Sequence, residues 1–138
     1  MTTKEWLRRG IFLERQINAL KEEREKLFAL VTKSTGKIDD NKVQVSTMNG
    51  SDNLLATYAD YSLEIERQID HLIAIKREII KTIDKVSDPT LKTLLMLRYV
   101  NIETWKQVAN EMNYSKRQTL RLHKKALEAV EDVLACHL

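Results

Sequence analysis

Cysteine, proline and glycine are scarce in this sequence, with one Cys, one Pro and three Gly among 138 residues. The single cysteine, Cys136, excludes an internal disulfide and a metal cage built on several thiolates, and it is typical of a protein in a reducing cytosol. Few helix-breaking residues, together with abundant Glu, Lys, Arg, Leu, Ile and Ala, predict an all-α fold.

Long apolar runs are also missing. The N-terminal stretch MTTKEWLRRG is charged and lacks the apolar centre of a signal peptide. The most apolar stretch, HLIAIKREII, is interrupted by Lys76, Arg77 and Glu78, so it does not predict a membrane span. We therefore expect a cytoplasmic protein with no membrane partner.

Motifs for catalysis, cofactors and metals are absent as well. The sequence has no Gly-rich phosphate loop and no nucleophile motif. His71 and His123 have no further ligands at the spacing of a metal site, and His123 is expected to be a boundary residue or a phosphate contact. The Asp39–Asp40 pair fits a turn better than a cation site, and Cys136–His137 lies in a terminal tail. We expect no enzyme activity, no cofactor and no metal.

The N-terminal third has the pattern of a long helix. Thr2 as N-cap and Glu5 three residues later predict a capping box. The residues that follow recur at alternating steps of four and three, the spacing of a coiled-coil seam. The members of this seam are Trp6, Gly10, Leu13, Ile17, Leu20, Arg24, Leu27 and Val31.

The helical pattern stops at residues 33–53, where Gly36, Gly50 and several turn-forming residues predict an irregular connector. Ser51 or Asp52 is suited to cap a second long helix. The seam of that helix consists of Leu54, Tyr58, Tyr61, Ile65, Leu72, Ile75, Ile79 and Val86.

Two long amphipathic helices joined by a connector predict an antiparallel, coiled-coil-like hairpin over residues 1–87, because neither helix buries its apolar stripe alone. Further isoleucines beside the second seam leave apolar surface for a partner. The seam pattern is compatible with pairing within one chain and between two chains. A homodimer through the N-terminal helices is therefore a further prediction.

The motif at residues 87–89, Ser-Asp-Pro, predicts the boundary to a second domain over residues 88–138. Asp88 is suited to cap a helix, and Pro89 fits its first position, where a missing N–H costs nothing. Trp105, further along, is expected to anchor the small core of this domain rather than to bind a ligand.

Two capping boxes divide the second domain into short helices. Thr104 is followed three residues later by Gln107, and Ser115 by Gln118. Asn113 lies between them, where a helix C-cap favours a residue that tolerates left-handed geometry. A short helix, a tight turn and a longer basic helix together predict a helix-turn-helix.

Positive charge is concentrated in the last helix. Residues 1–87 hold 15 Lys and Arg against 14 Asp and Glu, whereas residues 113–127 hold 5 against none. We expect Leu122, Ala126 and Val130 to face inward, with Thr119 one turn earlier on the same face. The local charge predicts an anionic partner, most simply the phosphates of double-stranded DNA, and a merely solvated helix face is the alternative.

The N-terminal turns of the second helix of a helix-turn-helix enter the major groove of DNA. Arg117 and Arg121 are four residues apart, and arginine binds guanine O6 and N7 with two hydrogen bonds. The lysines suit phosphates, while Gln118 is expected to be engaged mainly in its capping box. The candidate DNA-binding residues are Lys116, Arg117, Gln118, Leu120, Arg121, Lys124 and Lys125.

The segment LLMLRYVNIETWKQVANEMNYSKRQTLRLHKKAL resembles region four of bacterial sigma factors, in which LRY, a capped helix with W-x-x-[IV]-A and a serine opening a basic helix recur. It is more similar to small phage-encoded late transcription regulators of the ArpU/RinA type, whose recognition helix often ends in RLHKKAL, as residues 121–127 do. The match covers about residues 91–130, and KVQVS in the connector extends it weakly.

This resemblance implies a phage or prophage activator of late genes in the host bacterial cytoplasm, with RNA polymerase as a second partner. Thr119 departs from the aliphatic residue usual in the family. The chain also lacks the sigma-factor core that binds the promoter −10 element, so a complete sigma factor is not expected.

Two other functions fit the same layout. Phage small terminases, which recognise DNA for packaging, also join a helix-turn-helix to an oligomerising coiled coil, although their DNA-binding part usually comes first. A protein adaptor would instead use the basic helix to bind RNA polymerase or another acidic protein, without direct contact with DNA.

Overall fold

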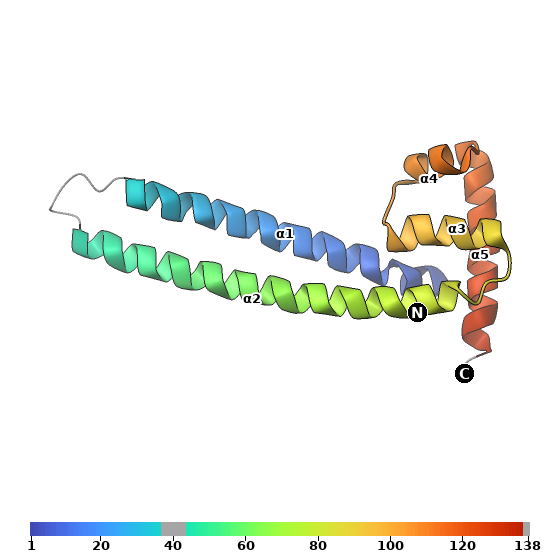
Figure 1. Cartoon of the computed structure of the whole chain (residues 1–138), viewed down its shortest axis with the longest axis horizontal. Coiled ribbons are helices and arrows are strands. Elements are labelled where there is room, and N and C mark those ends of the chain that lie inside the picture. The colour runs from blue at the N-terminus through green and yellow to red at the C-terminus, as the bar shows by residue number, and fades with distance from the viewer. Residues whose placement is uncertain (37–43, 137–138) are drawn as a thin grey trace. The chain divides into compact units, whose positions relative to one another are not determined.

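The computed structural model describes the backbone of residues 1–36 and 44–136 and the side chains of residues 1–33 and 52–136. Over these ranges the protein is all-α, as the composition predicted, and contains no strand. The elements are α1 (Thr3–Gly36), α2 (Gln44–Ile83), α3 (Pro89–Leu95), a π-helical turn η1 (Met96–Val100), α4 (Trp105–Met112) and α5 (Lys116–Ala135) (Figure 1).

The predicted irregular connector over residues 33–53 is wrong at both of its ends. α1 continues through Gly36 and α2 begins at Gln44, so Ser51 and Asp52 lie inside α2 and do not cap it. Unfavourable residues such as Ser, Asn and Gly cost at most about 1 kcal/mol each in a helix. Extending an existing helix needs no new nucleus, which offsets that cost. The predicted turn pair Asp39–Asp40 lies outside the described residues.

The helix starts predicted at Thr2 and Asp88 are confirmed. The backbone N–H of Thr2 donates to Glu5 Oε2 at 2.9 Å, and the N–H of Glu5 donates to Thr2 Oγ1 at 3.1 Å. Asp88 Oδ1 accepts from the backbone N–H of Thr90 at 2.9 Å, and Pro89 opens α3. These contacts satisfy N–H groups that have no partner within the first turn of a helix.

The chain forms two compact units, one of residues 1–13 and 72–138 and the other of residues 14–71. This grouping differs from the predicted division after residue 87. The start of α1 and the end of α2 belong with the C-terminal helices, since buried side chains such as Leu7, Ile79 and Ile83 contribute to the core of that unit.

In the unit of residues 14–71, the segments of α1 and α2 run side by side in opposite directions (Figure 1). Arg24, a polar member of the first seam, donates from Nη1 to Ser62 Oγ at 3.3 Å, and its guanidinium lies 5.7 Å from the ring centroid of Tyr58. The ring of Tyr58 also contacts that of Phe28, with centroids 5.8 Å apart. A polar seam position is thus used for interhelical contacts.

In the other unit, Gly10 lets α1 lie close to neighbouring chain segments. A β-carbon built on Gly10 would lie 3.8 Å from Leu72 Cδ1, 3.8 Å from the backbone oxygen of Tyr99 and 4.0 Å from Ile79 Cδ1. These are ordinary van der Waals distances. The site therefore has room for a methyl group, and its close neighbours account for a small residue at this seam position.

The C-terminal helices of the same unit pack around α5. α5 contacts both α3 and α4, and α4 also contacts η1 (Figure 1). The side chains buried among these elements are Leu91, Leu94, Leu95, Tyr99, Val108, Ala109, Thr119, His123, Ala126 and Val130.

Candidate nucleic-acid interface

α4 is bounded at both ends by the residues that the sequence predicted. The backbone N–H of Gln107 donates to Thr104 Oγ1 at 3.2 Å, and the N–H of Thr104 donates to Gln107 Oε1 at 2.8 Å. At the other end Asn113 adopts left-handed geometry with φ 59° and ψ 38°. Asparagine tolerates this region better than most residues, so the chain turns sharply there.

α5 begins with the second capping box. The N–H of Gln118 donates to Ser115 Oγ at 3.1 Å, and Gln118 Oε1 accepts from the Ser115 N–H at 3.1 Å. The Ser115 hydroxyl also donates to Gln118 Oε1 at 3.2 Å. The box fixes the first turn of α5 directly after the turn that follows α4.

The inward face of α5 differs by one residue from the prediction. Thr119, Ala126 and Val130 are fully buried, as predicted, but the fourth buried residue is His123, which is 6% exposed. Leu122, predicted to face inward, is only half buried. The steps from 119 to 123, 126 and 130 line one side of an α-helix, while a step of one residue turns by about 100°.

His123 is therefore a core residue, and the predicted boundary position or phosphate contact is wrong. Its Nε2 lies 2.6 Å from the Tyr99 hydroxyl, and its ring meets that of Trp105 edge-on at 4.4 Å between centroids. Burial, assisted by the nearby charges of Lys4 and Arg98, lowers the pKa of His123 to about 4. A neutral imidazole with a hydrogen-bond partner is tolerated in a core.

Tyr99 and Arg98 complete this core contact, and both precede the predicted helix-turn-helix. Burial raises the pKa of Tyr99 to about 12, so its phenol is neutral. Arg98 stacks on Trp105, 4.7 Å from the ring centroid, and its Nη1 donates to the backbone oxygen of Glu103 at 2.7 Å. Trp105 is a half-buried anchor between the arginine and the histidine.

The turn between η1 and α4 carries backbone strain. Ile102 has φ 56°, a region that β-branched residues rarely adopt. The N–H of Glu103 donates to the backbone oxygen of Leu97 at 3.1 Å, which helps to hold the turn. Nothing in the sequence around Ile102 signals this conformation.

The outward side of α5 holds all seven predicted DNA-binding residues. Each of them is exposed, including Leu120, whose side chain is 41% exposed. None of the five cations forms an ion pair with any residue that the structure describes. Their charges are thus available to an external anion.

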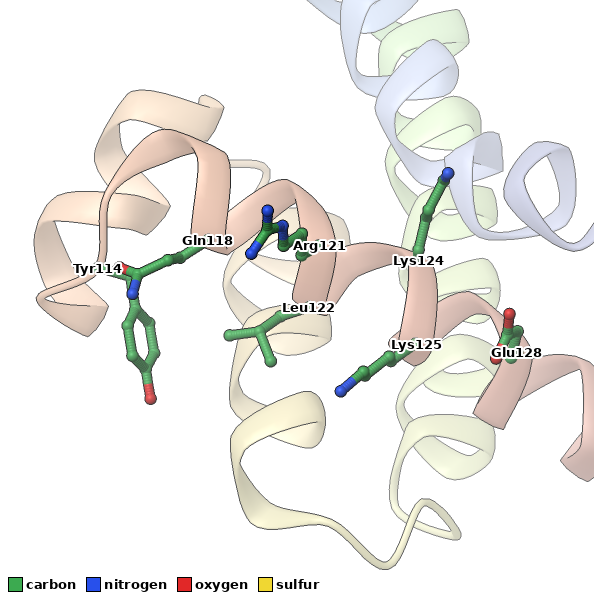
Figure 2. Close-up of a pocket in the computed structure, with 7 residues that line it drawn as sticks. All are labelled: Tyr114, Gln118, Arg121, Leu122, Lys124, Lys125 and Glu128. Atoms are coloured by element: carbon green, nitrogen blue, oxygen red, sulfur yellow. The ribbon is translucent and has the colours of Figure 1, made fainter.

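An open surface groove of about 540 Å³ runs along one side of α5 (Figure 2). Tyr114 and Leu122 contribute apolar surface to it, which accounts for the half-buried position of Leu122. Among the candidate DNA-binding residues, the groove brings together Gln118, Arg121, Lys124 and Lys125, together with Glu128. Lys116, Arg117 and Leu120 do not line it.

A family model described as "Protein of unknown function (DUF1492)" matches residues 30–131. The chain belongs to the DUF1492 family. The DUF1492 match contains every candidate residue of α5 as well as Tyr99 and His123. No curated protein and no solved structure matches the chain significantly.

The other sequence candidates are not brought together into a site. His71 is exposed, Cys136 is a free, exposed cysteine, and His137 lies outside the described residues. Within the described part of this DUF1492 chain, no group of three or more His, Cys, Asp or Glu is arranged to hold a metal ion. Nor is any helix there both long and apolar enough to cross a membrane.

Proposed function

We propose that this protein is a sequence-specific DNA-binding transcriptional regulator that uses α4, the turn at Asn113 and α5 as a helix-turn-helix. The observation that carries the proposal is the division of α5 into two sides. One side is buried against α3 and α4, whereas the other presents five cations without ion-pair partners among the described residues. An exposed, unpaired basic helix face attracts a polyanion.

The exposed residues of α5 fall into groups that favour different contacts with DNA, according to the chemistry of their side chains. Arg117 and Arg121 have planar guanidinium groups that match the O6 and N7 acceptors of guanine, so we assign sequence recognition to them. The charge of a lysine ammonium matters more than its geometry, and we assign phosphate contacts to Lys116, Lys124 and Lys125. Leu120 is suited to contact a thymine methyl group.

The biological role follows from the resemblance to ArpU/RinA-type regulators. On this proposal the protein acts in the host bacterial cytoplasm at promoters of phage or prophage late genes. It would contact RNA polymerase, and the N-terminal helices would form a homodimer. A dimer would bind two half-sites whose spacing follows the helical repeat of DNA.

Selection of bound fragments from the source genome, followed by a salt titration on the preferred fragment, tests the proposal. We expect a defined site and a binding constant that falls steeply with salt, by a logarithmic slope of about −0.9 for each phosphate contacted. Binding no stronger than that to random DNA would contradict sequence-specific recognition. Replacing Lys116, Arg117, Arg121, Lys124 and Lys125 together by glutamine should abolish binding, and retained binding would exclude this face of α5.

A further inference from the structure

The side-chain amide of Gln118 is held in one orientation by its capping box. Its Oε1 accepts two hydrogen bonds, from the backbone N–H of Ser115 at 3.1 Å and from the Ser115 hydroxyl at 3.2 Å. An amide oxygen has two lone pairs, so both are used. The backbone N–H of Ser115 is a donor and requires an acceptor, which fixes Oε1 rather than Nε2 on this side.

The other half of the amide is available. Gln118 is exposed, and no group among the described residues accepts a hydrogen bond from its Nε2. Gln118 lies beside Arg121 on the wall of the groove, at the end of α5 where Tyr114 is found (Figure 2). An amide in this position offers two N–H donors and no acceptor.

This restriction changes which base the residue can recognise. A free glutamine pairs with adenine by accepting from N6 and donating to N7. A glutamine whose oxygen is already occupied can only donate. Guanine offers two adjacent acceptors, N7 and O6, and thymine offers O4. Adenine offers one acceptor, N7, beside its N6 amino donor, which a donor-only amide cannot satisfy, and cytosine presents only a donor in the major groove.

We infer that Gln118 is a donor-only specificity residue that selects guanine or thymine in preference to adenine or cytosine at one position of the DNA site. The inference rests on the proposed DNA-binding function. It assigns to the capping box a role in recognition besides its role in starting α5. Because the box holds the amide before DNA is bound, the contact costs little side-chain entropy.

Gln118→Glu tests the inference without removing the cap. Glutamate also serves in capping boxes, so one carboxylate oxygen keeps the contacts with Ser115. The outward atom then becomes an acceptor, which suits the N4 amino group of cytosine or the N6 amino group of adenine. We expect preference at one base position to move from guanine or thymine to cytosine or adenine by about fivefold or more.

The matched control is Gln107→Glu, in the capping box that opens α4. It makes the same chemical change, adds the same charge and preserves an equivalent pair of cap contacts, with Thr104. Its melting temperature should shift about as little as that of Gln118→Glu, and its base preferences should equal those of the unmodified protein at every position. The control therefore shows how much DNA affinity the added charge alone removes at every site. A change in base preference at one position can then be assigned to Gln118.

The measurement is competitive binding of the full chain to variants of the selected site, with all four base pairs at each position. A switch confined to one position for Gln118→Glu, and absent for Gln107→Glu, supports the inference. If Gln118→Glu and the unmodified protein have identical base preferences, the inference is overturned while the proposed function stays intact. The same holds if the unmodified protein prefers adenine at the affected position. No sequence preference in the unmodified protein overturns both.

Discussion

The Tyr99 hydroxyl and Nε2 of His123 lie 2.6 Å apart and share one buried hydrogen bond. The contact joins η1 to α5 across 24 residues of sequence. It satisfies two polar groups that would otherwise be buried without partners, and it holds the inward face of α5 against the remainder of its unit. The exposed basic residues belong to the same helix as His123 and point away from this buried contact.

Acid should destabilise the protein through His123. The pKa of His123 is about 4 in the folded chain and 6.5 in its unperturbed state, so the unfolded chain binds more protons between these values. The free energy of unfolding should therefore fall as the pH decreases from 7, by about 2 kcal/mol at pH 5. Urea denaturation at both pH values measures this, and His123→Gln should show a smaller difference.

Tyr99→Phe should destabilise the protein by about 1–3 kcal/mol, because it leaves the buried Nε2 of His123 without its partner while preserving the ring. Tyr114→Phe is the matched control, since Tyr114 is exposed and the same hydroxyl loss should cost less than about 0.5 kcal/mol. Thermal or urea denaturation of the two variants provides the comparison. Equal effects would show that the Tyr99–His123 hydrogen bond contributes nothing to stability.

Arginine and lysine substitutions on α5 should differ in their effects on DNA binding. Arg117→Ala or Arg121→Ala should weaken binding to the selected site by about 1–3 kcal/mol and relax preference at the base pair that each contacts. Lys124→Ala should weaken binding to all sequences alike and reduce the salt slope by about 1. Titrations on selected and random DNA at several salt concentrations distinguish the two patterns. If the lysine variant relaxed base preference and the arginine variants weakened binding to all sequences alike, the roles proposed for the arginines and lysines would be contradicted.

Gly10→Ala should stabilise the protein slightly. Alanine favours a helix interior over glycine by up to about 1 kcal/mol, and the added methyl group meets its neighbours at 3.8–4.0 Å. Gly10→Leu should instead destabilise by about 1–3 kcal/mol or more, because the larger side chain has no space beside the backbone of Tyr99. Melting temperatures of both variants test this, and a stable leucine variant would contradict the close approach.

Residues that act within one or two helical turns were predicted well from the sequence. The capping boxes at Thr2, Thr104 and Ser115 and the left-handed residue Asn113 depend on hydrogen bonds or dihedral preferences a few residues apart. The seven candidate DNA-binding residues are all exposed on α5, and their position follows from the helical periodicity of this segment.

Tertiary packing determined the features that local patterns did not. Leu122 is more apolar than His123, yet His123 is buried because Tyr99 and Trp105, distant in sequence, provide its hydrogen bond and ring contact. Both long helices also extend into the segment predicted as an irregular connector, because adding residues to an existing helix needs no new nucleus.

The sequence by itself determined the all-α class, the starts of α1, α3, α4 and α5 and the basic side of α5, since each depends on composition or on neighbours along the helix. Only the tertiary structure decided that His123 belongs to the core, that Gly10 lies against the backbone of Tyr99, and that residues 1–13 group with the C-terminal helices. These features depend on contacts between segments far apart in the chain, which local periodicity does not encode.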